Sequence, residues 1–215
     1  MSCPLCLRQK VEQFDQDKSR HYLKCDCGLV YVPREELISE ADEKKRYDSH
    51  QNSESDPGYK NYLNQIAEAM LPFLNKKEEG LDFGCGSSKI MEEILSDNGF
   101  KTRSFDLYYH PEEALLKGKY HFLILSEVIE HLRNPREILL NLKGMLHANG
   151  KIFIKTKWYP DKIHDFSQWF YKRDLTHIQF FNESSFQELS HLLELEDIQI
   201  LGNDLYLFRS TIEEK

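Results

Sequence analysis

Four of the five cysteines in this 215-residue sequence lie within the first 27 residues, as a C-x-x-C pair and a C-x-C pair: Cys3, Cys6, Cys25 and Cys27. Four thiolates at this spacing can close a tetrahedral zinc site, and so short a segment has too little core to fold without metal. We therefore predict a zinc-ribbon-like segment at residues 1–33. Ribbons normally carry C-x-x-C twice, so two alternatives stay open: His21 replaces one cysteine, or reduced cysteines pack as small apolar groups.

A second chemical motif is the glycine loop DFGCG at residues 82–86. Gly84 and Gly86 let the backbone approach a ligand closely, and the helix that follows offers unpaired N–H groups to an anion. Asp106 comes twenty residues after Gly86, where a carboxylate can accept both hydroxyls of a ribose. Lys89 replaces the third glycine of a dinucleotide fingerprint, and Asp82 precedes the loop. This pattern favours a ligand with an amine over one with a pyrophosphate.

A third motif, E-x-x-E-H, places Glu127, Glu130 and His131 just after an expected strand. In a helix these positions share one face, so two carboxylates and an imidazole would converge there. His177 supplies a second, distant imidazole. Two glutamates and two histidines would suit Mg²⁺, Mn²⁺ or iron, which could lower the pKa of a bound hydroxyl. Without metal, His131 or His177 would act as an ordinary general base.

Aromatic residues crowd the segment 163–181, which contains Trp169, Tyr171 and His177. We expect these three residues on the substrate side of a site, with core packing at the sheet edge as the alternative. In the polar linker, Tyr47 and His50 are candidates to close over the ligand, and a solvated charged helix is the alternative reading.

The elements that must position these motifs follow from hydrophobic periodicity. Residues 34–57 are polar and predict a short helix followed by a connection. Short apolar runs then alternate with helical patterns. The expected strands are residues 80–83, 101–105, 121–125, 151–155, 196–201 and 205–210, and the expected helices cover about 59–73, 90–97, 135–146 and 184–193. This alternation predicts a parallel, doubly wound α/β sheet.

At this point the chain resembles class I S-adenosylmethionine-dependent methyltransferases over about residues 45–210. GLDFGCGSS is similar to their first motif, FDLYY to the acidic end of their second strand, and SEVIEHL with LHANGKIFIKT to their fourth and fifth strand regions. The resemblance implies a Rossmann-like, seven-stranded, mostly parallel sheet in a domain at residues 58–215.

The same resemblance implies roles for the motif residues. The loop Gly84, Cys85 and Gly86 would line the methionine part of S-adenosylmethionine, and Asp82 would help to hold its amino group through water or backbone. Asp106 would bind the ribose, Leu107 or Tyr108 would flank the adenine, and Glu127 would face the sulfonium. The E-x-x-E-H segment also resembles the metal-binding segment of ubiquinone-pathway O-methyltransferases and of small-RNA 3′-terminal 2′-O-methyltransferases.

Composition limits the function. The formal net charge is −8, which argues against a protein that binds nucleic acid mainly through contacts to phosphate groups. No apolar run reaches the roughly 20 residues that span a bilayer, so we expect a cytoplasmic protein. The predicted activity is methyl transfer to an oxygen or nitrogen of a small molecule. The alternatives are an RNA-modifying methyltransferase whose ribbon grips RNA, and a non-catalytic binding module on the same fold.

Overall fold

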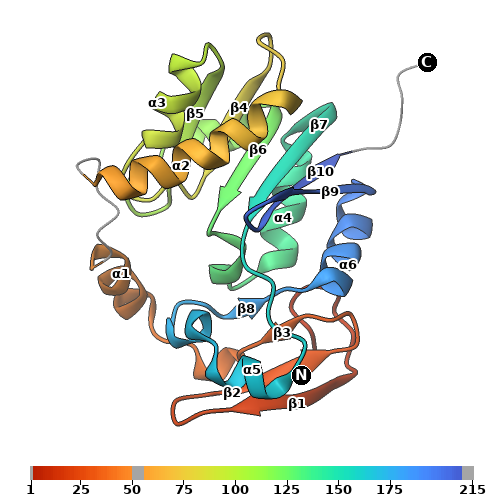
Figure 1. The fold of residues 1–215 in the computed structure, drawn as a ribbon. Coiled ribbons are helices and arrows are strands. Elements are labelled where there is room, and N and C mark those ends of the chain that lie inside the picture. Colours follow the sequence, from red (N-terminus) through yellow and green to blue (C-terminus); the bar gives the residue numbers. More distant parts are fainter. Residues whose placement is uncertain (1, 50–55, 210–215) are drawn as a thin grey trace.

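A central sheet organises the molecule in the computed structural model, which describes residues 2–49 and 56–209 (Figure 1). Within these residues the sheet has six strands in the order β5-β4-β6-β7-β10-β9. The strands are β4 (Glu79–Phe83), β5 (Lys101–Phe105), β6 (Tyr120–Ser126), β7 (Leu146–Lys155), β9 (Asp197–Gly202) and β10 (Leu205–Arg209). β5, β4, β6 and β7 pair in parallel, and β10 is antiparallel to both of its neighbours. The predicted mixed α/β fold with a mostly parallel sheet is confirmed.

The strand count differs by one from the seven that the resemblance implies. Between β5 and β6, residues 106–119 form a turn and the 3-10 helix η3 (Glu113–Lys117), with no strand in the described chain. That segment is too short for a further crossover helix and strand, so β5 forms one edge of the sheet. The helix predicted to reach Leu146 ends earlier, because the Tyr120 N–H donates to Met145 O at 2.8 Å and draws the chain into β7.

Helices cover both faces of this sheet (Figure 1). α2 (Pro57–Met70), which continues into the 3-10 helix η2 (Leu71–Phe73), lies with α3 (Ile90–Asp97) on one face. There, Leu63, Ile66 and Met70 join a core that contains Phe122 and Phe153. α4 (Pro135–Gly144) and α6 (Glu183–Leu193) cover the opposite face. This three-layer arrangement fixes the carboxyl ends of the parallel strands at one edge.

The N-terminal strands belong to a second sheet, of four strands in the described chain, at one end of the central sheet (Figure 1). β1 (Val11–Gln16), β2 (His21–Cys25) and β3 (Val30–Tyr31) pair in sequence, and β8 (Gln179–Phe180) adds to β3. The 3-10 helix η1 (Arg34–Glu36) and α1 (Glu40–Asp48) follow. The first 33 residues thus share a sheet with a strand near residue 180.

Two short helices, α5 (Ile163–Gln168) and the 3-10 helix η5 (Phe170–Arg173), connect β7 to β8 beside the N-terminal strands (Figure 1). Phe166 of α5 packs edge-on against Tyr22 of β2 at 5.3 Å between ring centroids, inside a core that also contains Val30 and Phe180. In the described ranges, no helix combines the length and the hydrophobicity needed to cross a bilayer.

Candidate active site

A cavity of about 1070 Å³ opens at the carboxyl ends of β4, β5 and β6. Its walls come from the loops after these strands, from α1 and α2, and from the segment around η5. Side chains named in the sequence analysis that line it are Gly84, Cys85, Gly86, Asp106, Leu107, Tyr108, Glu127, His131, Tyr171, His177 and Tyr47. Ligands of doubly wound folds bind at this edge, where strand ends meet.

The glycine loop turns on two residues with positive φ, Gly84 at +81° and Gly86 at +69°. A Cβ on Gly84 would lie 2.6 Å from Val128 Cγ2, so only glycine fits against the loop after β6. A Cβ on Gly86 would meet no heavy atom within 4 Å, so its backbone borders open space. The Gly84 and Cys85 N–H groups donate to Phe105 O, which fastens the loop to the end of β5. The loop is therefore a preformed backbone cradle.

Asp106 connects this cradle to the loop after β5. Its Oδ2 accepts from Gly86 N at 3.0 Å, and its Oδ1 accepts from Tyr108 N at 2.8 Å and from Tyr109 N at 3.1 Å. A carboxylate has about four acceptor positions, so it can bind hydroxyls as well as these N–H groups. Leu107 is 69% exposed and, with Tyr108, forms the adjoining wall.

Asp82 lies behind the loop, is buried, and is not among the side chains that line the cavity. Burial raises the pKa of its carboxyl to about 7, and the negative charges of Glu92 and Asp106 act in the same direction. Near neutral pH this carboxyl is therefore divided between its protonated and ionised forms, and a positive charge nearby would favour the ionised one.

The E-x-x-E-H segment converges by a different route from the one predicted. Glu127 has φ +54°, outside any right-handed helix, and the 3-10 helix η4 (Ile129–His131) begins two residues later. The helical interpretation was wrong because the Glu127 N–H donates to Lys155 O at 2.8 Å and extends the strand pairing past β6. The chain must then reverse sharply before Glu130.

Tyr171 joins the two carboxyl groups of that segment. Its hydroxyl donates to Glu127 Oε2 at 2.8 Å and also contacts Glu130 Oε1. Glu130 is fully buried, and burial followed by the charge of Glu127 raises the pKa of its carboxyl well above the usual range. Among the described residues, Glu130 Oε2 has no hydrogen-bond partner. The raised pKa therefore favours the protonated form of the Glu130 carboxyl.

The two histidines lie side by side in the cavity, with 4.7 Å between ring centroids. His131 Nδ1 lies 3.0 Å from Thr176 O, and His177 Nδ1 lies 2.7 Å from Tyr171 O. A carbonyl can only accept, so both Nδ1 atoms carry hydrogen and Nε2 is the basic nitrogen of each neutral ring. Burial lowers the pKa of His177, which keeps that ring neutral. Ligand atoms of Glu130, His131 and His177 lie within 4.8 Å of one another, and Glu127 is outside this group.

Two residues that the sequence analysis did not single out fix Glu127. Tyr62, on α2, donates to Glu127 Oε1 at 3.1 Å. The Lys155 ammonium, only 4% exposed, lies 3.4 Å from the same oxygen. Lys155 is the last residue of β7, and Glu127 directly follows β6. Because β6 and β7 pair in parallel, their ends bring these two residues together. The available signal was a lysine at the end of an apolar parallel strand.

α1 lies across the cavity mouth. Tyr47 contacts the rings of Tyr108 and His131, at 5.9 and 5.4 Å between centroids. An ion pair between Glu43 and Arg133, at 2.7 Å, fastens the helix to the loop after η4. Tyr47 thus lines the cavity, and its closure over a ligand stays a prediction, whereas His50 falls outside the described residues.

The aromatic segment divides between cavity and core. Tyr171 and His177 face the cavity, but Trp169 is not among its lining residues. Trp169 packs 4.9 Å from Tyr171 and 6.0 Å from Phe180 between ring centroids. The structure therefore places Trp169 behind Tyr171 and out of reach of a ligand in the cavity.

The four N-terminal cysteines form a separate group whose sulfurs lie within 4.8 Å of one another. Cys3 Sγ is 3.7 Å from Cys27 Sγ, and Cys6 Sγ is 3.5 Å from Cys25 Sγ. His21 is not part of this group, because its Nδ1 lies 2.6 Å from Glu36 Oε1. The C-x-C pair therefore brings both of its cysteines to the cluster.

Comparisons with known proteins agree on the fold. No curated protein matches the chain in sequence. A similar solved structure is 1,6-didemethyltoxoflavin-N1-methyltransferase from Burkholderia thailandensis, with bound 1,6-didemethyltoxoflavin and S-adenosylhomocysteine. It is 14% identical with a TM-score of 0.58, over 94% of this chain and 100% of that chain.

Two further structures have a similar fold. A SAM-dependent methyltransferase from Archaeoglobus fulgidus is 17% identical with a TM-score of 0.52, over 65% of this chain and 71% of that chain. The pyocyanin biosynthetic protein PhzM is 12% identical with a TM-score of 0.52, over 78% of this chain and 61% of that chain. At these identities the likeness shows the fold alone.

The family of the chain follows from a match of its sequence to a family profile. The profile of the methyltransferase domain family matches residues 57–200, well over half of the chain, from the start of α2 to β9. This range contains the glycine loop, Asp106 and both histidines. The chain belongs to the methyltransferase domain family.

Proposed function

We propose that this methyltransferase transfers the methyl group of S-adenosylmethionine to an oxygen or nitrogen atom of a small molecule. The observation that carries the proposal is the position of Asp106, whose carboxylate holds the glycine cradle through Gly86 N at 3.0 Å beside the large cavity. Glycine loop and acidic residue together are much more specific than either alone.

The residues present fit this cofactor. Gly84, Cys85 and Gly86 would hold the methionine part against open backbone, since a Cβ on Gly86 would meet nothing within 4 Å. The Asp106 carboxylate would accept the ribose hydroxyls, and Leu107 and Tyr108 would enclose the adenine. When bound, S-adenosylmethionine supplies a methyl group on a positively charged sulfur, which is already an activated leaving group.

Glu127 would face that positive charge. Tyr62, Lys155 and Tyr171 fix both of its oxygens, so the carboxylate is held without needing to reorganise when a cation binds. Glu130, whose raised pKa favours the protonated form, contacts the same Tyr171 hydroxyl and supports its orientation.

The histidine pair would receive the proton of the acceptor. As the new C–O or C–N bond forms and the C–S bond breaks, the acceptor loses one proton, and Nε2 of His131 or His177 can accept it. Their Nδ1–H bonds to Thr176 O and Tyr171 O set the tautomer this requires. The remaining contribution to catalysis is that the cavity would hold the acceptor atom in line with the methyl carbon and the sulfur.

A divalent cation such as Mg²⁺ or Mn²⁺ is the second candidate for activating the acceptor at the same place. Glu130, His131 and His177 have ligand atoms within 4.8 Å of one another, and Glu130 Oε2 has no hydrogen-bond partner in the described chain. These residues fit one carboxylate and two imidazole ligands, which would lower the pKa of a bound hydroxyl. Chelation decides between the two, because only the metal route loses activity with EDTA and regains it with Mn²⁺.

Small molecules are the acceptors we favour. The cavity has aromatic walls from Tyr47, Tyr108, Phe170 and Tyr171, and the net charge of −8 opposes a nucleic-acid partner. The similar Burkholderia structure contains bound 1,6-didemethyltoxoflavin, a small molecule. A panel of phenols and nitrogen heteroaromatics, incubated with methyl-labelled S-adenosylmethionine, would identify the class.

We further propose that the four cysteines bind one structural zinc ion. Four sulfurs within 4.8 Å of one another give the closed all-cysteine ligand set of structural zinc sites. The thiols must lose their protons to bind, and one Zn²⁺ ion would neutralise half of the charge of the four thiolates.

Asp106→Ala tests the cofactor site. Calorimetric titration of the wild-type protein with S-adenosylhomocysteine should show binding, and the variant should bind about 100-fold more weakly, because a charge-assisted hydrogen bond contributes about 1.5–3 kcal/mol. Glu112→Ala is the matched control, since Glu112 pairs with Arg103 at 3.0 Å on the surface of the same loop. Absence of heat with the wild-type protein would overturn the proposed function, and unchanged affinity of Asp106→Ala would remove its ribose role.

The raised pKa of Asp82 predicts pH-dependent cofactor affinity. A cationic amino group near Asp82 favours the ionised carboxyl, so binding should release a proton where Asp82 is protonated in the free protein. Affinity for S-adenosylhomocysteine should then rise about tenfold from pH 6 to pH 8 and level off above the pKa of about 7. Calorimetry in two buffers of different ionisation enthalpy measures the number of protons released when the ligand binds. The Asp82→Asn variant should lack both effects; equal pH dependence in that variant would contradict the assignment.

A further inference from the structure

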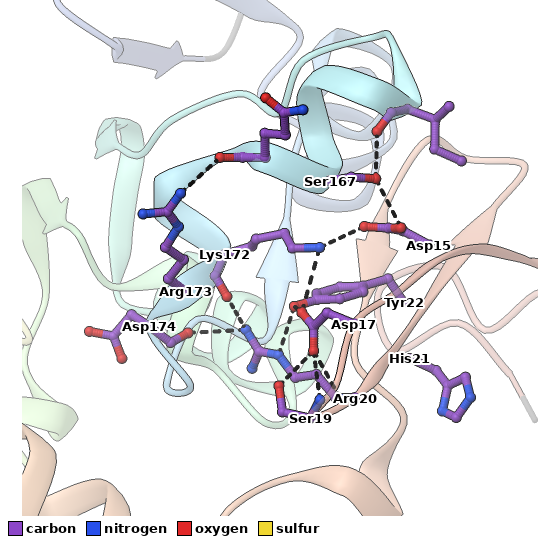
Figure 2. A network of polar contacts seen from close by, with 12 residues as sticks. Asp15, Asp17, Ser19, Arg20, His21, Tyr22, Ser167, Lys172, Arg173 and Asp174 are labelled. Carbon is purple, nitrogen blue, oxygen red and sulfur yellow. Dashed lines mark hydrogen bonds and ion pairs between the residues drawn. The ribbon is translucent and has the colours of Figure 1, made fainter.

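The turn between β1 and β2 contacts the segment that supplies Tyr171 and His177. Figure 2 shows Asp15, Asp17, Arg20 and Tyr22 from the N-terminal strands and their turn meeting Lys172 and Asp174, more than 150 residues later in the chain. Two cations are at the centre of this contact, Arg20 and Lys172, and each is only 4% exposed.

Arg20 holds the backbone of that segment. Its guanidinium donates to Lys172 O at 2.7 Å, to Leu175 O at 3.0 Å and to Asp174 O at 3.1 Å. It also donates to the Tyr22 hydroxyl at 3.0 Å. These carbonyls lie in the last turn of η5 and directly after it, where the helical pattern of N–H donors ends. The rigid guanidinium, with five N–H donors, serves these three carbonyls and the Tyr22 hydroxyl together, whereas an ammonium has only three donors for four acceptors.

Lys172 fastens the same segment from its side chain. Its ammonium lies 2.6 Å from Asp15 Oδ2 and 3.5 Å from Asp17 Oδ2. It also lies over the rings of Tyr22 and Phe166, at 4.3 and 5.1 Å from their centroids. A buried ammonium is costly unless it is paired, so this geometry fixes where residue 172 sits on the hairpin.

The held carbonyls lie between the two cavity residues. Tyr171 directly precedes Lys172, and its own carbonyl accepts from His177 Nδ1. The His177 N–H donates to Asp174 O at 3.1 Å, and the next N–H, of Ile178, donates to Glu130 O at 2.8 Å. A shift of residues 172–175 would therefore move the Tyr171 hydroxyl and the His177 ring together.

Attachment of the N-terminal strands does not require these buried cations. β3 already pairs with β8 through Val30 and Phe180. Tyr159 donates to Gly28 O at 2.8 Å, and Arg8 pairs with Glu188 at 2.8 Å on the outer side of α6. The Arg20 and Lys172 contacts add something different, because they reach the loop between Tyr171 and His177 and the other ties named here do not.

We propose that the β1–β2 hairpin, none of whose residues lines the cavity, supports the acceptor side of the site from behind. In this proposal Arg20 is a positioning residue that holds Tyr171 and His177 in register with Glu127, Glu130 and His131. The inference rests on the proposed methyl transfer. It assigns the N-terminal segment to the acceptor half of the cavity, whereas the cofactor half, built by β4, β5 and the start of α3, is independent of it.

Arg20→Met, compared with Arg8→Met, tests this role. Methionine fills similar space without donors, and the control breaks an exposed ion pair on the same N-terminal segment. Hydrogen exchange of the His177 and Ile178 amides should accelerate at least about tenfold in Arg20→Met and stay unchanged in Arg8→Met. With the best acceptor from the panel, kcat/KM should fall about 10- to 100-fold while S-adenosylhomocysteine affinity stays within about twofold.

Further variants and controls distinguish between the possible results of this experiment. Arg20→Lys, which retains the charge and reaches fewer carbonyls, should lie between wild type and Arg20→Met, and it decides the question if the methionine variant does not fold. Added guanidinium ion should restore part of the activity of Arg20→Ala, whose short side chain leaves space for it. Unchanged exchange at residues 177–178 together with unchanged kcat/KM would overturn the inference. If the wild-type protein binds no S-adenosylhomocysteine, the proposed function fails, and the exchange measurement still decides what Arg20 positions.

Discussion

Replacing His131 or His177 with alanine should lower kcat about 10²–10⁴-fold and leave the affinity for S-adenosylhomocysteine within about twofold. The reason is the geometry of the pair. The rings lie 4.7 Å apart, both Nδ1 atoms donate to backbone carbonyls, and Nε2 of each is left as the base. Steady-state rates with the best acceptor measure kcat, and calorimetry measures the cofactor half independently.

His164→Ala is the matched control for these variants. His164 is an exposed histidine on α5, bonded to Gln168, and it is outside the cavity lining. The double variant His131→Ala with His177→Ala should be little worse than the more damaging single one, because residues that act as a unit are not additive. Retention of wild-type kcat by both single variants would remove the histidines from the reaction. Loss of activity with EDTA and its return with Mn²⁺ would replace the general-base route with the metal route.

Removal of zinc should produce the largest effect on stability. We expect one zinc per chain by metal analysis, lost in Cys25→Ser and by strong chelation. Structural zinc binds with an apparent free energy of about 10–16 kcal/mol, and each kcal/mol shifts Tm by roughly 2–4 °C in a chain of this size. Tm should therefore fall by more than about 10 °C, with hydrogen exchange rising first in β1, β2 and β3.

Cys85→Ser is the control for zinc content. Cys85 is buried in the glycine loop, apart from the four-cysteine group, so this variant should keep its zinc. A wild-type protein purified without zinc, or one whose Tm does not respond to chelation, would show that the cysteines pack as reduced apolar groups.

The central sheet was predictable because its signals are local. The segments ending in Phe83 and Phe105 became β4 and β5 as expected, and the glycine loop and Asp106 followed at their ends. The missing seventh strand could also be suspected, since residues 106–119 leave little room for a crossover. Strands, glycine loops and connection lengths depend on residues that are close together in the sequence. The period of the hydrophobic residues and the positions of the glycines therefore predict them directly.

The site needed information that local patterns do not contain. The left-handed conformation of Glu127 depends on pairing with Lys155 O, and the bonds from Tyr62 and Lys155 to Glu127 cross between elements. Arg20 reads in the sequence as a surface cation in a turn. Its partners are carbonyl oxygens, which carry no side-chain identity that could have pointed to them.

Pairing of β3 with β8 also has a consequence for synthesis of the chain. Val30 cannot acquire its partner Phe180 until about 150 further residues have left the ribosome, and contacts at such sequence separation form slowly. During synthesis β1, β2 and β3 therefore form a sheet whose β3 edge stays unpaired until the Rossmann-like body has assembled. Early capture of a metal ion would protect that unpaired edge from pairing with a neighbouring nascent chain.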